Sequence, residues 1–505
     1  MLVNVGERAR REVDHEAQAQ ARYTGPILAL TFLAVQGFDV QSYPLVNYDT
    51  AFLNDAGLQL VTSGQFRADV LSQNPGFERH YLWQPPALSL FSGLAYWLFG
   101  FGIWQTRLFS IVFGALGVWA TFELVRYLRP SGIGALVAAL SLFFLPAWVL
   151  TAKDARMDTG AILALLVATL LVLKSIGPDG RSGTMFLAGL SVSIAGLFHT
   201  AAVTWAFSLL VVVVLFSEKP LRSAVLYCFG GALLVALWLL YALQFPAEFY
   251  RQYVELLTDR AGNDTLVARV GGEIGRYIST FSRAPAFYLL LGLGVYGVVE
   301  AALWKDRRIR ALIVLTALLL VFNTLMVGGR DSGFYNLYPL TAALCLLGVG
   351  ADVLLLRLEN KPQRVIAAGT MLCVGAFVAN AAALSVGPRV LAYVFQGPQR
   401  DYAAQMTPFS SLLKTGDEVW GMAPVWFAVR KAGARLDAVE QVPPWRPTRP
   451  DAHRHKYVVV DRGNTFDGSQ DYEKIMEFGA DLPLVLGSPL TNKSYSFDLW
   501  QSKLH

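Results

Sequence analysis

PALSLFSGLAYWLFGF, residues 86–101, decides the topology of this chain. The run is apolar, yet it is shorter than the roughly 20 residues that a straight helix needs to cross a bilayer. Pro85 and Pro86 introduce it, and proline suits the first turn of a helix. Whether this run crosses the membrane fixes the side on which every later loop lies.

The composition is that of a polytopic membrane protein. Of the 505 residues, 54% are hydrophobic and 16% are charged, whereas soluble domains carry about 25% charged residues. The net charge of +5 is explained by loop lysines and arginines that set topology, so we infer no nucleic-acid partner. Cys228, Cys345 and Cys373 lie inside apolar runs, which favours small buried side chains over a disulfide framework.

Apolar runs recur along most of the chain. Residues 1–22 are polar and arginine-rich, and no convincing cleavage site follows the first apolar segment, so we predict an uncleaved first span with a cytoplasmic N-terminus. The runs are 26–40, 86–101, 105–128, 132–150, 159–173, 184–199, 201–216, 223–244, 285–304, 310–328, 334–356 and 365–386.

Loop charges decide how these runs are threaded. If 86–101 does not cross, the basic clusters at 126–129, 174–181, 219–222, 305–310 and 357–364 share the side of the N-terminal arginines. We therefore interpret 86–101 as a re-entrant or interfacial helix. About eleven spans result, and the segments 41–104, 151–158, 245–284 and everything after 387 are predicted to be extracytoplasmic.

The composition shifts after Pro388, where long apolar runs end. Strands are predicted at 417–423, 456–461, 483–487 and 494–500, with a short helix at 424–433. We therefore divide the chain into a transmembrane domain, 1–387, and a small extracytoplasmic α/β domain, 388–505.

Two outer segments carry unusual charge. Lys153, Asp154, Arg156 and Asp158 lie between two apolar runs, where ionisable groups persist mainly when they face water, a partner or a substrate. The segment 245–284 is rich in arginine, although basic residues are usually concentrated in cytoplasmic loops and this segment is predicted to be extracytoplasmic. This indicates that the segment binds an anion. A polyprenyl-phosphate sugar suits this setting, because its phosphate needs a cation and the acceptor hydroxyl needs a carboxylate base.

Short motifs follow one another in an order that resembles a known family. The motifs are Tyr48-Asp49-Thr50 leading into Gly64, Gln84-Pro85-Pro86-Ala87, Gly102 to Arg107, Arg126 to Gly134, Ala155-Arg156-Met157-Asp158 and Phe334-Tyr335-Asn336-Leu337-Tyr338-Pro339-Leu340. In their order and spacing, over about residues 25–390, the chain resembles the GT-C membrane glycosyltransferases, specifically the group of protein O-mannosyltransferases and lipid A aminoarabinose transferases.

The resemblance implies roles for two acids. Asp49 would be the catalytic base at the end of the first span, and Asp158 would orient the acceptor or a metal. Many relatives carry an acidic pair at the first place, but Thr50 stands at its second position here. The simpler alternatives are that Asp49 caps the helix beginning at Thr50, and that Asp158 caps a helix or pairs with Lys153 or Arg156.

Other polar residues are weaker candidates. Arg156, Arg269, Arg276 and Arg330 are candidates for the donor phosphate, although each has a structural alternative as a paired or interfacial charge. Tyr335 and Tyr338 are candidates to line the pocket or to anchor the membrane interface. Glu78 and His80 are the only metal candidates, so the cofactor stays open between none and a divalent metal. We expect His199 to satisfy a backbone carbonyl.

These features predict a mainly α protein: a transmembrane bundle of GT-C type with interfacial helices in the first outer loop and an outer α/β domain. The predicted function is inverting transfer of one sugar from a polyprenyl phosphate to an acceptor hydroxyl on a cell-envelope glycolipid, a glycan or a protein, at a bacterial-type inner membrane. A transporter or flippase is one alternative, and it would place charges near the midplane. A ligase that uses a polyprenyl-diphosphate glycan is another.

Overall fold

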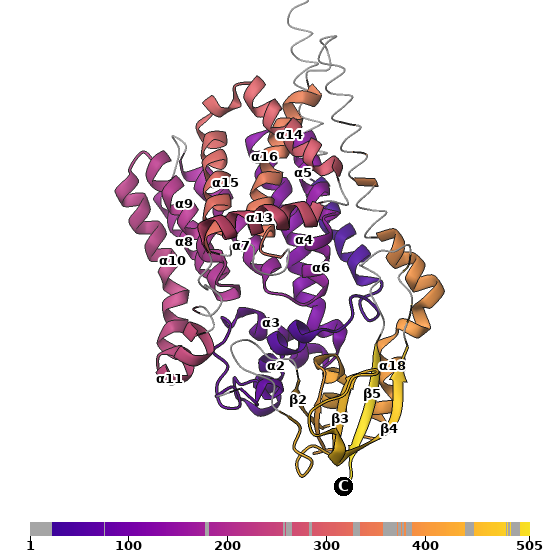
Figure 1. Cartoon of the computed structure of the whole chain (residues 1–505). Coiled ribbons are helices and arrows are strands. Elements are labelled where there is room, and N and C mark those ends of the chain that lie inside the picture. Colours follow the sequence, from indigo (N-terminus) through magenta and orange to yellow (C-terminus); the bar gives the residue numbers. More distant parts are fainter. Residues whose placement is uncertain are drawn as a thin grey trace, which may run out of the picture.

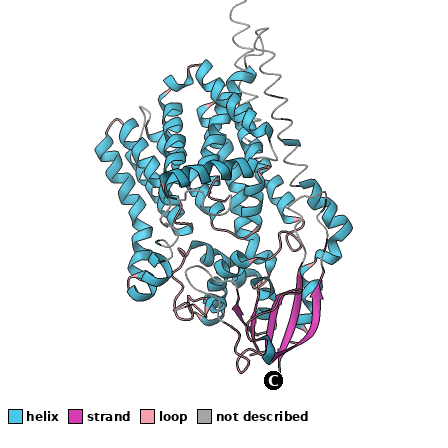
Figure 2. Cartoon of the chain, in the orientation of Figure 1, coloured by secondary structure: helices cyan, strands magenta, loops and turns pink. Residues whose placement is uncertain are grey.

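A computed structural model shows a bundle of helices above a smaller domain that contains a sheet (Figure 1). It describes residues 23–74, 76–176, 181–255, 265–281, 285–326, 334–356, 386–439, 449–480 and 495–505, with a few isolated positions between them. Figure 2 shows the strands confined to the C-terminal part. The predicted mainly helical fold with a small α/β domain is therefore confirmed.

The bundle is built from long apolar helices. In the described part of the chain, five of them are long and apolar enough to cross a membrane. The helix α8 packs between α7 and α10, and α16 packs on α5 and α14. The five are α4 (Ile103–Leu128), α7 (Asp158–Ser175), α10 (Pro220–Ala242), α15 (Arg307–Met326) and α16 (Leu337–Leu356). Shorter apolar helices are α8 (Ser182–Phe198), α9 (Ala202–Phe216) and α14 (Pro285–Glu300).

One predicted span differs in the structure. The run 132–150 forms two helices, α5 (Ile133–Phe143) and α6 (Pro146–Lys153), bent by 59° at the break between them. Pro146 is the cause, because it lacks the N–H that a continuous helix needs at that position. The run 365–386 lies mostly outside the described residues, and the number of eleven spans stays a prediction.

The predicted first outer loop, 41–104, contains two short helices that lie below the bundle (Figure 1). These are α2 (Tyr48–Ser63) and α3 (Ala87–Phe99), with a single turn, η1 (Asp69–Leu71), between them. At about 1.5 Å per residue, α3 is too short to cross roughly 30 Å of hydrocarbon. This length supports the prediction that 86–101 is an interfacial or re-entrant helix.

Close packing joins α2 to α3. A Cβ at Gly57 would lie 2.3 Å from the carbonyl oxygen of Ser89 and 2.8 Å from the backbone nitrogen of Gly93. Only glycine permits this approach. Since α2 begins one residue before Asp49, the contact also fixes the place of that carboxylate.

The C-terminal part holds a five-stranded mixed sheet with the order β2-β1-β3-β5-β4. β1 is parallel to β2 and β3, while β5 is antiparallel to β3 and β4. The elements are α18 (Tyr402–Ser410), β1 (Glu418–Gly421), α19 (Trp426–Lys431), β2 (Arg435–Ala438), β3 (Tyr457–Asp461), β4 (Tyr472–Gly479) and β5 (Ser496–Ser502).

Three predicted strands and the predicted helix are found close to their expected places. They are β1, β3, β5 and α19. The strands β2 and β4 were missed. β4 is a polar edge strand whose inner residues are mostly exposed, so it has no alternating apolar pattern. The predicted strand 483–487 lies, apart from Val485, outside the described residues.

Buried polar contacts dock this sheet domain onto the first outer loop. The Asp55 carboxylate on α2 accepts hydrogen bonds from Trp426 Nε1 at 3.0 Å and Arg430 Nη2 at 3.0 Å. The Tyr495 hydroxyl accepts from the backbone N–H of Val46 at 2.7 Å. Because these partners are hundreds of residues apart, the sheet domain and the loop that carries Asp49 form one packed unit.

Substituting Gly57 by alanine should push α2 away from α3. Overpacking against backbone costs about 1–3 kcal/mol, so we expect a lower midpoint of thermal unfolding in detergent. Gly183 on α8 is the matched control, because no described atom lies within 4 Å of the position that a Cβ would take there, and Gly183→Ala should leave the midpoint unchanged or raise it. Equal midpoints for both variants would contradict the close contact.

Candidate active site

Asp49 lies in the first turn of α2, where Asn47 and not Asp49 is the capping residue. Asn47 Oδ1 accepts from the Thr50 N–H at 3.0 Å, and Asn47 Nδ2 donates to Asp154 Oδ2 at 2.9 Å. The interpretation of Asp49 as a helix cap is therefore wrong. Its carboxylate is left to point toward the second outer segment.

Arg156 joins the two predicted acids. Its Nη1 donates to Asp49 Oδ2, and its Nε donates to Asp158 Oδ2 at 3.1 Å. Asp158 is fully buried, whereas the Asp49 side chain retains 17% exposure. A buried arginine paired with two carboxylates is a strong arrangement, and it leaves Asp49 as the more accessible acid.

Aromatic residues from the start of α16 enclose the same charges. Phe334 lies under the Arg156 guanidinium at 4.1 Å, and the Tyr338 hydroxyl donates to Asp158 Oδ1 at 3.4 Å. Tyr335 stacks on His199 with 5.7 Å between ring centroids. The structure thus brings Tyr338 to Asp158 and Tyr335 to the neighbouring His199.

His199 belongs to this cluster, although it was not among the predicted site residues. Its Nδ1 lies 2.8 Å from the Tyr338 hydroxyl and 3.4 Å from Asp158 Oδ1, so this ring nitrogen faces side chains of the site. His199 directly follows Phe198, the last residue of α8, and its ring contacts α16 through Tyr338. The place of this histidine at the end of a span was the one sequence feature that pointed to a role. Its partner Tyr338 is 139 residues away in the sequence, so the pairing could not be predicted.

A second layer of buried charge holds the turn between α6 and α7. Lys153 and Arg389 both pair with Asp39, and Arg389 Nε lies 2.9 Å from Asp39 Oδ2. Ala155 adopts a φ of 54°, which only a well-supported turn retains in a residue other than glycine. Burial raises the pKa of Asp154 in this turn to about 6, and the nearby Arg107 charge partly opposes that rise.

Arg269 and Arg276, two of the other predicted phosphate ligands, have contacts of their own on α13 (Leu266–Phe281). They lie on one face of this helix, as expected, but Arg276 pairs with Glu273 and Arg269 donates to the Leu325 carbonyl. These contacts do not join either arginine to Asp49 or Asp158. Arg330 lies outside the described residues. Their role in phosphate binding stays a prediction.

Glu78 and His80 do not face one another as a pair. His80 Nδ1 lies 2.5 Å from Glu248 Oε2, and its ring stacks on Phe245 at 3.6 Å. Glu78 instead pairs with Arg79 at 3.3 Å. The expectation that these two residues share a metal is thus not supported by their contacts.

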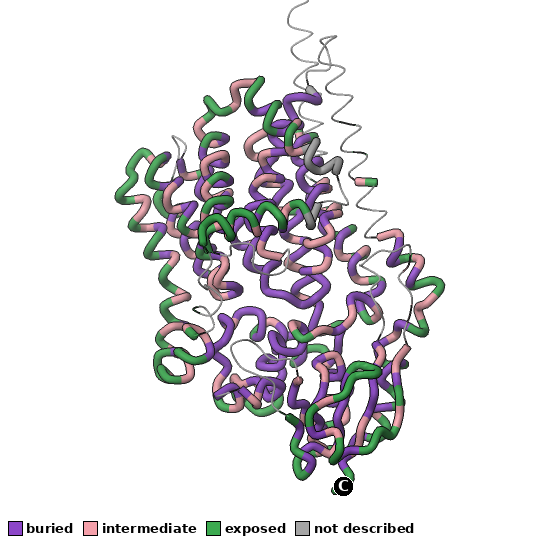
Figure 3. Tube along the Cα trace, in the orientation of Figure 1, coloured by how far each residue is buried: buried purple, intermediate pink, exposed green. Residues whose placement is uncertain are grey.

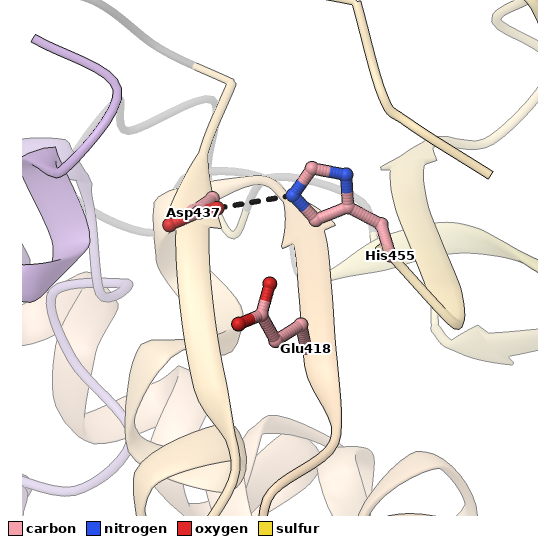
Figure 4. A group of neighbouring side chains, drawn as sticks. All are labelled: Glu418, Asp437 and His455. Atoms are coloured by element: carbon pink, nitrogen blue, oxygen red, sulfur yellow. Dashed lines mark hydrogen bonds and ion pairs between the residues drawn. The ribbon is translucent and has the colours of Figure 1, made fainter. Parts of the chain in front are cut away.

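Another group has the residue types of a metal site, namely Glu418, Asp437 and His455 on the sheet domain (Figure 4). His455 Nδ1 accepts from the Asp451 N–H at 2.9 Å, so Nε2 carries the proton that it shares with Asp437 Oδ2 at 3.0 Å. Both ring nitrogens are therefore engaged in hydrogen bonds.

Asp437 is surrounded by proton donors. Ser72 Oγ and Gln73 Nε2, at 2.5 and 2.7 Å, reach it from the first outer loop, and Arg454 Nη2 lies 2.7 Å away. Arg454 also pairs with Glu418. A cation would have to displace these donors, so the group fits a docking hub better than a metal centre.

An apolar cavity of about 530 Å³ opens between the first outer loop and the helices α8 and α10. Aliphatic and aromatic side chains line it, so it suits a hydrocarbon chain rather than a polar ligand. The lining residues are Leu60, Gly64, Phe66, Pro86, Leu90, Leu197, Leu234, Leu237, Trp238 and Tyr241.

The chain has the fold of the GT-C membrane glycosyltransferases. This fold combines the helical bundle with the two short helices α2 and α3, and the two acids Asp49 and Asp158 meet where these parts join. The family model of dolichyl-phosphate-mannose-protein mannosyltransferases matches residues 83–241, which is less than half of the chain. A comparison with curated protein sequences found no significant match.

Solved structures support this fold assignment. The chain is similar to ArnT from Cupriavidus metallidurans bound to undecaprenyl phosphate, with a TM-score of 0.64 and 16% identity, over 93% of this chain and 97% of that one. It also resembles mycobacterial arabinofuranosyltransferase AftD, with a TM-score of 0.52 and 16% identity, over 95% of this chain and 40% of that one. The Archaeoglobus fulgidus oligosaccharyltransferase matches with a TM-score of 0.50 and 12% identity, over 86% and 67% of the two chains. At these identities the likeness shows the fold alone.

The Asp437 hub makes docking of the sheet domain sensitive to acid. Burial alone would raise the pKa of Asp437, but hydrogen bonds from His455 and Ser72 and the charges of Arg454 and Arg435 hold it below its ordinary value. A carboxylate with a lowered pKa stabilises the fold above its unfolded-state pKa, and that contribution is lost as the pH falls toward the folded-state pKa.

We therefore compare the wild type with Asp437→Asn by thermal unfolding across pH. The variant should be less stable by about 1–3 kcal/mol at pH 7, because buried donors lose a charged acceptor. The difference between the thermal midpoints of the wild type and the variant should stay constant from neutral pH down to about 5 and become smaller below about 4. A gap that does not change with pH would contradict the role of the ionised carboxylate.

Proposed function

We propose that the chain is an inverting glycosyltransferase that moves one sugar from a polyprenyl-phosphate donor to an acceptor hydroxyl. The observation that carries the proposal is Arg156, which lies between Asp49 and Asp158 and brings two predicted outer segments into one site. The reaction would take place on the extracytoplasmic face of an inner-membrane protein, with the sheet domain on the same side.

The site has the groups that an in-line displacement needs. The acceptor oxygen attacks the anomeric carbon, the bond from that carbon to the phosphate oxygen breaks, and polyprenyl phosphate leaves. Asp49, the more exposed acid, takes the acceptor proton. The attack comes from the face opposite the leaving group, so the anomeric configuration inverts.

Arg156 would stabilise the charge that develops on the leaving phosphate. A guanidinium has five N–H donors, and the bonds to Asp49 and Asp158 use one on Nη1 and one on Nε. His199 and Tyr338 hold Asp158 in place, and Asp158 in turn holds Arg156. The apolar cavity beside α10 supports a donor with a hydrocarbon tail.

The similar fold of ArnT, solved with undecaprenyl phosphate, supports a donor carried on such a lipid. The sugar and the acceptor are not defined by these contacts. Mass spectrometry of the lipid that co-purifies would identify the donor. A polyprenyl diphosphate glycan, or no polyprenyl lipid at all, would contradict the proposal.

Asp49→Asn should abolish transfer while it preserves donor binding. Loss of a general base costs about 10²–10⁴-fold in rate, so we expect kcat to fall by at least 100-fold in proteoliposomes supplied with the co-purified donor. Binding of undecaprenyl phosphate should persist. The matched control is Asp467→Asn in an exposed part of the sheet domain, which should keep full activity. Full transfer by Asp49→Asn would refute the mechanism.

Arg156→Gln should lose both transfer and binding of undecaprenyl phosphate, since the phosphate loses its cation. A thermal midpoint measured on the same sample separates this effect from unfolding, because removal of one partner of a buried ion pair costs about 3–5 kcal/mol. If the variant remained folded and still bound the lipid phosphate with unchanged affinity, Arg156 would have no role in phosphate recognition.

A further inference from the structure

The helix α13 has its polar and apolar faces reversed relative to a helix on a water-exposed surface. Its polar residues Arg269, Glu273 and Arg276 lie on the face that packs against the bundle. Figure 3 shows α13 as a largely exposed helix that lies across the bundle. The exposed side chains are Leu266, Val267, Val270, Ile274 and Ile278, with Ala268, Gly271 and Gly275 between them.

The inward face is held by specific polar contacts with α15. Asn323 Nδ2 donates to Glu273 Oε1 at 2.9 Å, Arg276 pairs with Glu273, and Arg269 donates to the Leu325 carbonyl. Glu273 and Arg276 are both buried. These contacts fix the rotation of α13 about its axis, so its apolar stripe must face outward.

Such a rotation is unfavourable in water. A surface helix of a soluble protein turns its apolar stripe toward the core and its charges outward. Val267 is 82% exposed and Ile274 is 54% exposed, so in water α13 would leave a continuous aliphatic surface unburied. In hydrocarbon the same surface has no such cost, and the inward charges are the groups that need shelter.

The depth of α13 agrees with a lipid environment. Asn323 comes 16 residues after Arg307, the basic end of α15, which corresponds to about 24 Å along a helix. The hydrocarbon core is about 30 Å thick, so the contact lies inside the leaflet opposite the basic end. The exposed stripe of α13 also continues onto Leu320, Val321, Leu325 and Met326 of α15.

We propose that α13 is an in-plane helix of the outer leaflet whose stripe of Leu266, Val267, Val270, Ile274 and Ile278 contacts lipid acyl chains. The segment 245–284 is then not wholly an aqueous loop, because its most regular helix lies among lipids. The inference concerns the membrane surface of the protein and does not depend on the transfer reaction.

The test is nitroxide accessibility in vesicles of phosphatidylethanolamine and phosphatidylglycerol. Single cysteines replace Val267, Val270 or Ile274 in a full-length chain whose Cys228, Cys345 and Cys373 are changed to alanine. Phe229, exposed on the spanning helix α10 and outside the apolar cavity, is the lipid reference, and Lys503, exposed on the sheet domain, is the water reference. Collisions with oxygen and with a water-soluble nickel chelate are measured for each label.

We expect the oxygen-to-nickel ratio on α13 to lie within about twofold of the ratio at 229 and about tenfold above the ratio at 503, because the polar chelate is excluded from hydrocarbon. A ratio that matches position 503 would overturn the proposal and return α13 to water. Low collision rates with both reagents, or dipolar broadening between copies, would overturn it in favour of a protein partner on the stripe. Circular dichroism of each labelled sample confirms that the helices are intact.

Discussion

Charge that is buried away from water has to be paired, and this constraint connects the distant parts of the molecule. Asp39 pairs with Lys153 and Arg389, Asp49 and Asp158 share Arg156, and Asp55 pairs with Arg430. Apart from Arg156 and Asp158, which are neighbours in one turn, each pair joins segments that are far apart in the sequence. An unpaired member would carry a penalty of several kcal/mol, so these partners fix how the first outer loop, the turn after α6 and the sheet domain fit together.

The candidate site follows from that framework. Asn47 ties the start of α2 to Asp154, and Arg156 ties Asp49 to Asp158, so the two predicted outer segments form one rigid surface. Close contact between Gly57 and the backbone of α3 also holds α2, which carries Asp49, in place. Rigid placement of this kind is what a displacement at a sugar carbon requires, because the acid and the cation must keep their positions as charge moves.

Site residues could be predicted from the sequence where an unusual residue type stood out from its immediate neighbours. The charges at 153–158 indicated a site, and Asp49, Arg156, Asp158, Tyr335 and Tyr338 do meet. The sequence did not place His199 beside Asp158 on α7 and Tyr338 on α16, and it did not predict that Pro146 breaks the run 132–150 into two helices. The pairing of His80 with Glu248 was equally out of reach, because it depends on how the third outer segment folds back.

The amino-acid sequence by itself determined the membrane class, the approximate places of the spans and the small C-terminal α/β domain, since hydropathy and periodicity are local properties of the chain. It also indicated that Arg269 and Arg276 share one helix face. Only the tertiary structure decided that this face turns inward and that an aliphatic stripe turns outward. The physical reason is that the rotation of a helix is set by its contacts, here with Asn323 and Leu325 on α15, and those contacts are not encoded in the spacing of α13.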